Sequence, residues 1–149
     1  MRAMTKAMMR AGMRVRMLSV CVAVALVVFH SGLARADSDA VRKVISDQIT
    51  AFQADDFDTA FTFASPSIKQ IFGDAERFGQ MVRNGYPMVW RPAEVTFLET
   101  EQVDGAFRQH VLIRDQQGVY YELQYDMIEG EEGWKINGVQ VKRASEGIA

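Results

Sequence analysis

The chain has 149 residues, with 17 basic and 19 acidic side chains and a formal charge of −2. The charge is unevenly distributed, because the first 36 residues hold six basic residues and no acidic one. Residues 37–149 therefore carry 11 basic against 19 acidic residues, a formal charge of −8 on a length that suits one domain. An acidic surface without Lys/Arg clusters disfavours nucleic acid and anionic membranes as partners.

Residues 1–36 have the layout of a cleaved secretory signal peptide. A basic, acid-free stretch precedes the apolar run Met17–Phe29, and Ala34 and Ala36 then stand at the spacing of a signal cleavage site. The run would cover about 20 Å as a helix, against roughly 30 Å of membrane hydrocarbon, so cleavage between Ala36 and Asp37 is favoured over a membrane anchor. An Arg-Arg pair is missing before the run, which predicts a periplasmic or secreted protein exported by the general secretory route.

Removal of the signal peptide changes which chemistry the remaining domain can carry. It takes away Cys21, the only cysteine of the chain, and leaves His110 as the only histidine. The domain therefore has no disulfide, no thiol nucleophile and no thiolate metal site. The clustered acids Asp55, Asp56 and Asp58 are too few for a calcium loop and are better explained as helix caps. We predict no metal site and no cofactor.

Helical patterns occupy the first half of the domain. Residues 37–55 carry apolar side chains at the spacing of one helical face, which predicts an amphipathic helix. Three short helices are expected to follow. The first begins after Asp56, the second begins at Ser65-Pro66 and stops at Gly73, and the third runs from Asp74 to Asn84-Gly85.

The pattern changes from Pro92 onward to the alternation typical of strands. Four strands are predicted, over residues 94–99, 107–114, 119–127 and 134–141. Asp104-Gly105 indicates a tight hairpin turn, and a slip in the alternation at Asn137-Gly138 indicates a β-bulge. The predicted fold is α+β, with N-terminal short helices packed on one face of a curved four-stranded antiparallel sheet.

Three segments resemble a bacterial family of domains of unknown function, number 4864. They are ITAFQADDFDTAFTFASPSIKQIFG at 49–73, MVRNGYPMVWRP at 81–92 and GWKINGVQV at 133–141. The family is similar in element order to the cone-shaped fold of nuclear transport factor 2 and ketosteroid isomerase. That resemblance implies a helical layer closing over a curved antiparallel sheet, and it brings no catalytic residues. Proteins of that fold include isomerases, dehydratases, ligand binders and interaction modules, so the fold does not select a function.

The strand pattern does not provide a catalytic site. An isomerase of this kind needs a carboxylate base inside the cone, but alternation directs Glu122 and Asp126 to the outer face of the sheet. The inner face instead receives Tyr121, Tyr125 and Gln109. Each tyrosine is either a core aromatic or a pocket wall, and the buried amide of Gln109 is either satisfied by backbone or water or directed at a ligand. We predict no catalytic residue.

The segment between the last helix and the first strand combines two prolines with bulky apolar side chains. Tyr86 and Trp90 are either part of a crossover that plugs one end of the cone or walls of a pocket mouth. In the second case Arg91 would meet an anionic group of a ligand.

The preferred hypothesis is an exported, non-catalytic domain that binds a small apolar molecule inside the cone. The predicted pocket residues are Tyr86, Trp90, Gln109, Tyr121, Tyr125 and Trp134. The alternative is an interaction module that forms a homodimer through the outer sheet face, using His110, Leu112, Tyr120, Glu122 and Gln124. An isomerase or dehydratase is the third possibility, and it requires a carboxylate within hydrogen-bond reach of a tyrosine inside the cone.

Overall fold

The structure is a computed structural model that describes residues 15–143, with side chains from Ala34 to Lys142. Residues 1–14, the first part of the predicted signal peptide, lie outside the described residues. The chain divides into two units after Asp37, and the first unit contains the beginning of helix α1 (Val15–Gln53). None of the described helices is both long enough and apolar enough to cross a membrane.

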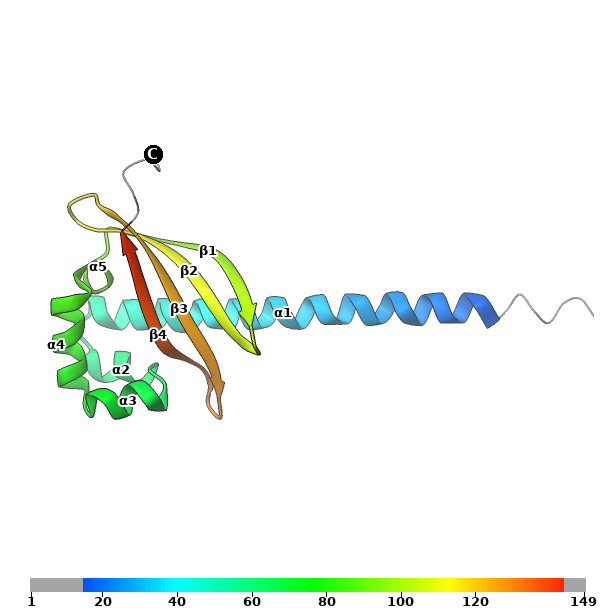
Figure 1. Cartoon of the computed structure of the whole chain (residues 1–149), viewed down its shortest axis with the longest axis horizontal. Helices are drawn as coiled ribbons and strands as arrows, with labels where there is room; N and C mark the ends of the chain where they lie inside the picture. The colour runs from blue at the N-terminus through cyan, green and yellow to red at the C-terminus, as the bar shows by residue number, and fades with distance from the viewer. Residues whose placement is uncertain (1–14, 144–149) are drawn as a thin grey trace, which may run out of the picture. The chain divides into compact units, whose positions relative to one another are not determined.

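The second unit contains the rest of the helices and the sheet. Four short helices follow α1: α2 (Phe57–Thr62), α3 (Pro66–Phe72), α4 (Ala75–Gly85) and α5 (Pro87–Trp90). Four strands come next: β1 (Glu94–Val103), β2 (Ala106–Arg114), β3 (Tyr120–Gly130) and β4 (Gly133–Arg143). The strands form one open antiparallel sheet in the order β1-β2-β3-β4, and the helices pack on one of its faces (Figure 1). The predicted α+β fold is confirmed.

The short helices begin where the sequence predicts capping residues. The side chains of Asp56, Ser65 and Asp74 each accept a hydrogen bond from the backbone N–H three residues later, at 3.0, 3.3 and 2.8 Å. Each cap satisfies an N–H group that the first helical turn leaves unpaired. Gly73 ends α3 at a φ of 79°, a conformation that glycine adopts without steric cost.

Two bulges interrupt the strand pairing. In β4, Asp126 pairs with Gly138 and Met127 pairs with Ile136, so Asn137 is the extra residue, as the sequence predicts. The second bulge lies in β1 and was not predicted. There the pairing jumps from Phe97 to Thr100, so two residues of β1 oppose one residue of β2. The bulge turns Thr100 toward the helices and leaves Glu99 exposed, which reverses the simple alternation.

The helical layer is fastened to the edge strand β4 at its bulge. Ser65 N–H donates to the Ile136 carbonyl at 2.8 Å, and Ile136 N–H donates to the Phe63 carbonyl at 2.9 Å. The hydroxyl of Ser65, which is fully buried, donates to Oδ1 of Asn137 at 2.9 Å. These bonds fix the distance between the α2–α3 connection and the sheet, and they cover an otherwise unpaired strand edge.

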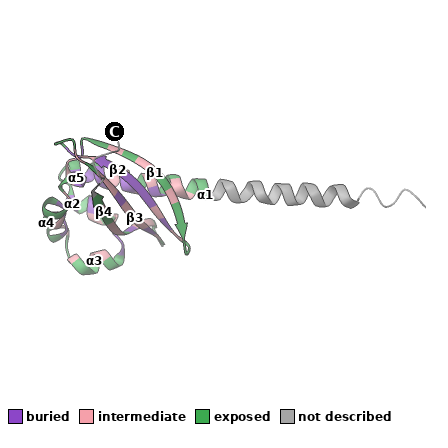
Figure 2. Cartoon of the chain, turned by 45° about the horizontal axis from the view of Figure 1, so that its top comes forward, coloured by how far each residue is buried: buried purple, intermediate pink, exposed green. Residues whose placement is uncertain are grey.

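One apolar core lies between the two layers, and Figure 2 shows buried residues on the sheet strands and on the helices. Phe78 of α4 is the centre of an aromatic cluster, with its ring centroid 5.9, 5.1 and 5.7 Å from those of Phe52, Phe61 and Phe72. Next to it, a Cβ on Gly79 would lie 2.8 Å from the Phe57 ring. The absence of a side chain at this glycine therefore allows α4 to approach α2 closely.

Candidate functional site

A cavity of about 410 Å³ lies between the helices and the inner face of the sheet. Apolar side chains from α1, α4, α5 and β4 form most of its wall, among them Phe52, Phe78, Val82, Val89 and Ile136. The cavity volume falls within the range of small-molecule sites, roughly 300–1,000 Å³. Half-buried side chains of α3 and α4, including those of Ile68, Phe72 and Met81, line the side nearest the solvent.

The most unusual polar group among the residues around the cavity is the hydroxyl of Tyr125 on β3. This side chain is 1% exposed, and its hydroxyl has no hydrogen-bond partner among the described residues. Burial, and to a smaller extent the neighbouring Tyr86 phenol, raises the pKa of Tyr125 above its usual value. The phenol is therefore neutral and keeps its proton over the whole physiological pH range.

The two other polar side chains of the cavity have partners within the fold. The Tyr86 hydroxyl donates to the Val139 carbonyl over a long 3.5 Å. The Gln48 side-chain amide donates to the Ala60 carbonyl at 3.2 Å and thereby holds α1 against α2. Tyr125 differs from both because nothing in the described structure occupies its hydrogen-bonding capacity.

All described residues that line the cavity are uncharged, and none of them is a carboxylate. Elsewhere in the described part of the chain, no group of three or more His, Cys, Asp or Glu side chains is placed to hold a metal ion. The arrangement provides a mostly apolar and uncharged wall, which is the chemistry of a site that encloses a molecule of low polarity.

The structure brings together two of the six predicted pocket residues. Tyr86 and Tyr125 line the cavity, whereas the other four lie outside its lining: Trp90, Gln109, Tyr121 and Trp134. Trp134 packs edge-on against Phe107 with ring centroids 5.0 Å apart, and Tyr121 packs half-buried against the core.

Sequence reasoning missed Gln48 as a lining residue. The signal was present, because Gln48 shares the helical face of Val41, Ile45 and Phe52, where an apolar residue is expected. A polar side chain at a core position of an amphipathic helix indicates either an internal hydrogen bond or a pocket. Gln48 has both.

Trp90 belongs to a polar cluster at the end of α1. Its indole N–H donates to Oδ1 of Asp55 at 2.8 Å, and Arg91 donates to both oxygens of the same carboxylate at 2.9 Å. Arg91 also donates to the Phe52 carbonyl at 3.0 Å and stacks over the Trp90 ring at 4.3 Å. These contacts join the C-terminal end of α1 to α5, so the Arg91 guanidinium is already paired with a carboxylate within the fold.

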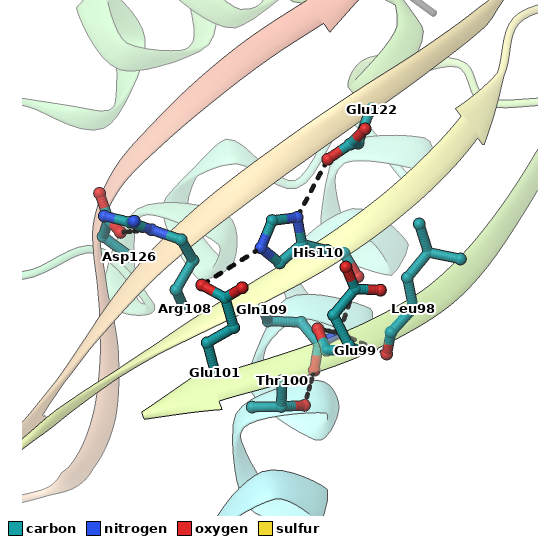
Figure 3. A network of polar contacts seen from close by, with 9 residues as sticks. All are labelled: Leu98, Glu99, Thr100, Glu101, Arg108, Gln109, His110, Glu122 and Asp126. Carbon is teal, nitrogen blue, oxygen red and sulfur yellow. Dashed lines mark hydrogen bonds and ion pairs between the residues drawn. The ribbon is translucent and has the colours of Figure 1, made fainter. Parts of the chain in front are cut away.

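Gln109 of β2 is completely buried beside the bulge in β1, and its amide is fully hydrogen-bonded (Figure 3). Its Oε1 accepts from the Thr100 hydroxyl at 2.6 Å and from Nε of Arg42 at 3.2 Å. Its Nε2 lies 2.7–3.1 Å from three carbonyl oxygens, two of which belong to Leu98 and Glu99 of the bulge. The amide replaces the strand-to-strand hydrogen bonds that the bulge removes.

The outer face of the sheet is dominated by paired charges (Figure 3). Nδ1 of His110 lies 3.0 Å from Glu122, and its Nε2 lies 3.7 Å from Glu101. Beside them, Arg108 pairs with Asp126 at 2.8 Å. The charged side chains of this face therefore pair within a single copy of the domain, whereas Nε2 of the buried His110 has no hydrogen-bond partner among the described residues.

Fold and cavity together define a small α+β domain with an uncharged, ligand-sized cavity between a helical layer and an open antiparallel sheet. The chain belongs to the family described as Domain of unknown function (DUF4864), whose family model matches residues 34–148. The family resemblance that the sequence segments indicate is thus confirmed. No curated protein and no solved structure matches the chain.

Proposed function

We propose that residues 37–149 form a non-catalytic domain that binds one small, largely apolar molecule in the cavity. The cavity of about 410 Å³, with its uncharged and mostly apolar lining, is the observation that carries the proposal. Protein interiors are close-packed and contain few voids larger than a water molecule. A cavity of this size that is partly open to solvent exposes apolar wall to water, and a bound apolar molecule would remove that wall from water.

The proposal includes a cone-shaped fold of the nuclear transport factor 2 type. Helices cover one face of an open antiparallel sheet, and bulges in β1 and β4 bend the strands, which is compatible with such a cone. In this arrangement a ligand would lie at the wide end, between α3, α4 and the sheet. The fold supports a binding site there without selecting its chemistry.

The proposal also includes export by the general secretory route, with cleavage between Ala36 and Asp37. Cleavage would leave a helix that begins near Ser38, a favourable capping residue, with Asp37 and Asp39 at its positive end. The test is the intact mass of the protein in the periplasmic or secreted fraction. The expected mass is that of residues 37–149, and a mass that includes residues 1–36 would contradict export with cleavage.

Two other functions have less support. A homodimer through the outer sheet face would have to bury charges that already pair with one another, and on the described strands only Val103 and Tyr120 are exposed large apolar side chains, at 39% and 37%. Burying charged groups costs free energy unless their pairing is retained. An isomerase or dehydratase needs a carboxylate beside a tyrosine, and the described lining residues include no carboxylate.

A neutral fluorescent probe tests the proposed function. N-phenyl-1-naphthylamine brightens when it leaves water for an apolar site, so its titration with the domain should saturate at one probe per domain. Val139→Trp places an indole in the cavity and should abolish the saturable signal. The matched control is Val103→Trp, which makes the same change at an exposed strand position outside the lining.

Circular dichroism shows whether each variant folds. Because Val139→Trp could overpack the core, Met81→Trp on the half-buried surface of α4 provides a second way to fill the cavity. A probe signal that does not saturate, or one that is equal in folded Val139→Trp, Met81→Trp and Val103→Trp, would overturn the proposal.

A further inference from the structure

Helix α3 is held in the helical layer by apolar contacts. None of its seven residues is buried, whereas each of the other helices contains buried side chains. Within the described part of the chain, no hydrogen bond or ion pair joins residues 66–72 to another helix or strand. A segment with little buried surface and no polar links opens at a low cost in free energy. Helix α3 is therefore the part of the layer that can move most readily.

The two ends of α3 are suited to a rotation of the helix as a unit. Before its first residue, the fully buried Ser65 is bonded to Ile136 and Asn137 of β4, which gives the helix a fixed pivot. At its other end, Gly73 is exposed and has a φ of 79°, and the nearest atom to a Cβ there would be the Arg77 guanidinium at 3.9 Å. Hinges are residues at the ends of elements that absorb changes in φ and ψ.

The apolar face of α3 is buried only in part. Ile68, Ile71 and Phe72 have the i, i+3, i+4 spacing that gathers side chains on one side of a helix. Ile68 and Phe72 are half-buried and line the cavity, whereas Ile71 is 72% exposed. A single exposed apolar side chain is ordinary on a protein surface. Here, however, it continues a helical face that already borders a cavity open to solvent.

We infer that α3 is a movable cover of the cavity, which opens to admit a molecule and closes over it with Ile71 turned onto the bound molecule. This inference rests on the proposed function, because it states how that site is loaded and closed. The bound molecule supplies the driving force: closure removes its apolar surface and that of Ile71 from water together. A ligand that gains these contacts only in the closed position shifts α3 toward it.

A single thiol at position 71 tests the closure. In a Cys21→Ser background the chain has no cysteine, so Ile71→Cys adds one reporter, and intact mass measures its modification by N-ethylmaleimide. Saturating N-phenyl-1-naphthylamine should slow the modification by about tenfold, the value for a cover closed in about nine of ten occupied molecules. The matched control is Gln70→Cys on the exposed, opposite side of α3, where the rate should stay within about twofold.

Hydrogen exchange shows whether the helix itself moves. The N–H groups of Lys69 and Gly73 donate to carbonyls one turn earlier, at 2.9 and 2.8 Å. Without the probe, these amides should exchange faster than those of the buried part of α1 around Ile45, because opening of α3 alone exposes them. The probe should slow both by about tenfold and leave the turn at Asp104-Gly105 unchanged. Equal exchange with and without the probe would show that α3 does not move.

Ile71→Ser tests the contact that closure creates. Because Ile71 is largely exposed in the empty domain, the substitution should leave the melting temperature close to that of the wild type. Loss of the apolar contact in the closed form should speed dissociation of the probe by about fivefold, with the association rate within about twofold. Val103→Ser removes an exposed apolar side chain from β1 and should change neither rate.

The outcomes separate this inference from the proposed function. If the probe does not saturate the wild type, the proposed function fails and the cover fails with it. If the probe saturates but modification at position 71 is not slowed, the cavity binds molecules beneath an immobile α3, and only the cover is wrong. Equal probe dissociation from Ile71→Ser and Val103→Ser would also overturn the closure, because Ile71 would then not contact the bound molecule.

Discussion

Gln109 and Tyr125 are neighbours on paired strands, point to the same face of the sheet and are equally buried, at 0% and 1% exposure. The two side chains differ in whether their polar atoms have hydrogen-bond partners. The amide of Gln109 has partners for both its oxygen and its nitrogen, whereas the Tyr125 hydroxyl has none among the described residues. Burial of a polar side chain therefore does not by itself indicate a ligand site, because the fold can satisfy the buried group completely.

The difference arises from what lies on either side of the two residues. Gln109 faces the β1 bulge, which releases two backbone carbonyls and turns the Thr100 hydroxyl inward. Tyr125 is paired with Val139 of β4, whose carbonyl accepts a hydrogen bond from Tyr86. One site is filled by the chain itself, and the other borders the cavity.

The largest expected effect comes from Gln109→Leu, which keeps the volume and removes the amide. It should lower the free energy of unfolding by about 3 kcal/mol, because the bulge carbonyls and the Thr100 hydroxyl lose their partner in a buried site. Urea denaturation measures the change. A loss below about 1 kcal/mol would mean that the amide is not required by the fold, and the contrast with Tyr125 would disappear.

A smaller loss is expected for Thr100→Val, which removes one hydroxyl from the same cluster. The free energy of unfolding should fall by about 1 kcal/mol, since Oε1 of Gln109 keeps its hydrogen bond from Arg42. The double variant with Gln109→Leu should lose less than the sum of the single losses, because both substitutions act on one network. Additive losses would show that the two residues are energetically independent.

Tyr125→Phe should not lower the free energy of unfolding, in contrast to the two substitutions above. In ligand-free protein it removes an unpaired buried hydroxyl, so the free energy of unfolding should stay unchanged or rise by up to about 1 kcal/mol. The same urea titration gives the value, and Tyr121→Phe provides the reference for loss of a hydroxyl outside the cavity. A clear destabilisation by Tyr125→Phe would reveal a hydrogen bond to the hydroxyl and would remove the basis of the contrast.

The smallest effect on stability is expected from substitution of Asp55, whose carboxylate faces solvent. Hydrogen bonds from Trp90 and then from Arg91 lower the pKa of Asp55 below its usual 3.8. The contribution to stability is therefore complete above that pH and is lost as the pH falls through the lower folded-state pKa. Asp55→Asn, which tolerates the φ of 57° at this position, should lower the melting temperature slightly at neutral pH. The difference should vanish in strong acid, and a difference that persists there would exclude the carboxylate as its cause.

The sequence predicted those features that depend on local signals. Asp56, Ser65 and Asp74 are found as caps, and β2 and β3 follow the predicted alternation, because each signal acts within a few residues of its effect. The Asn137 bulge was visible for the same reason. The β1 bulge was not, since Leu98-Glu99 contains no glycine or proline and is stabilised by side chains from distant parts of the chain.

The candidate site was accessible to sequence reasoning only in part. Alternation puts Tyr125 on the inner face, but it puts Gln109 there equally, and no local pattern distinguishes a satisfied amide from an unpaired phenol. The existence of the cavity depends on how far the helices stand from the sheet. That distance is set by the contacts of Ser65 with Ile136 and Asn137, more than 70 residues away in sequence.

The cavity also determines how binding would change the heat capacity of the domain. Burial of apolar surface on binding gives a negative change in heat capacity. The cavity wall is mostly apolar and partly open to solvent, so a molecule that fills the cavity removes apolar surface from water. Calorimetric titrations at several temperatures should therefore give a binding enthalpy that becomes more negative as the temperature rises, whichever apolar molecule is bound.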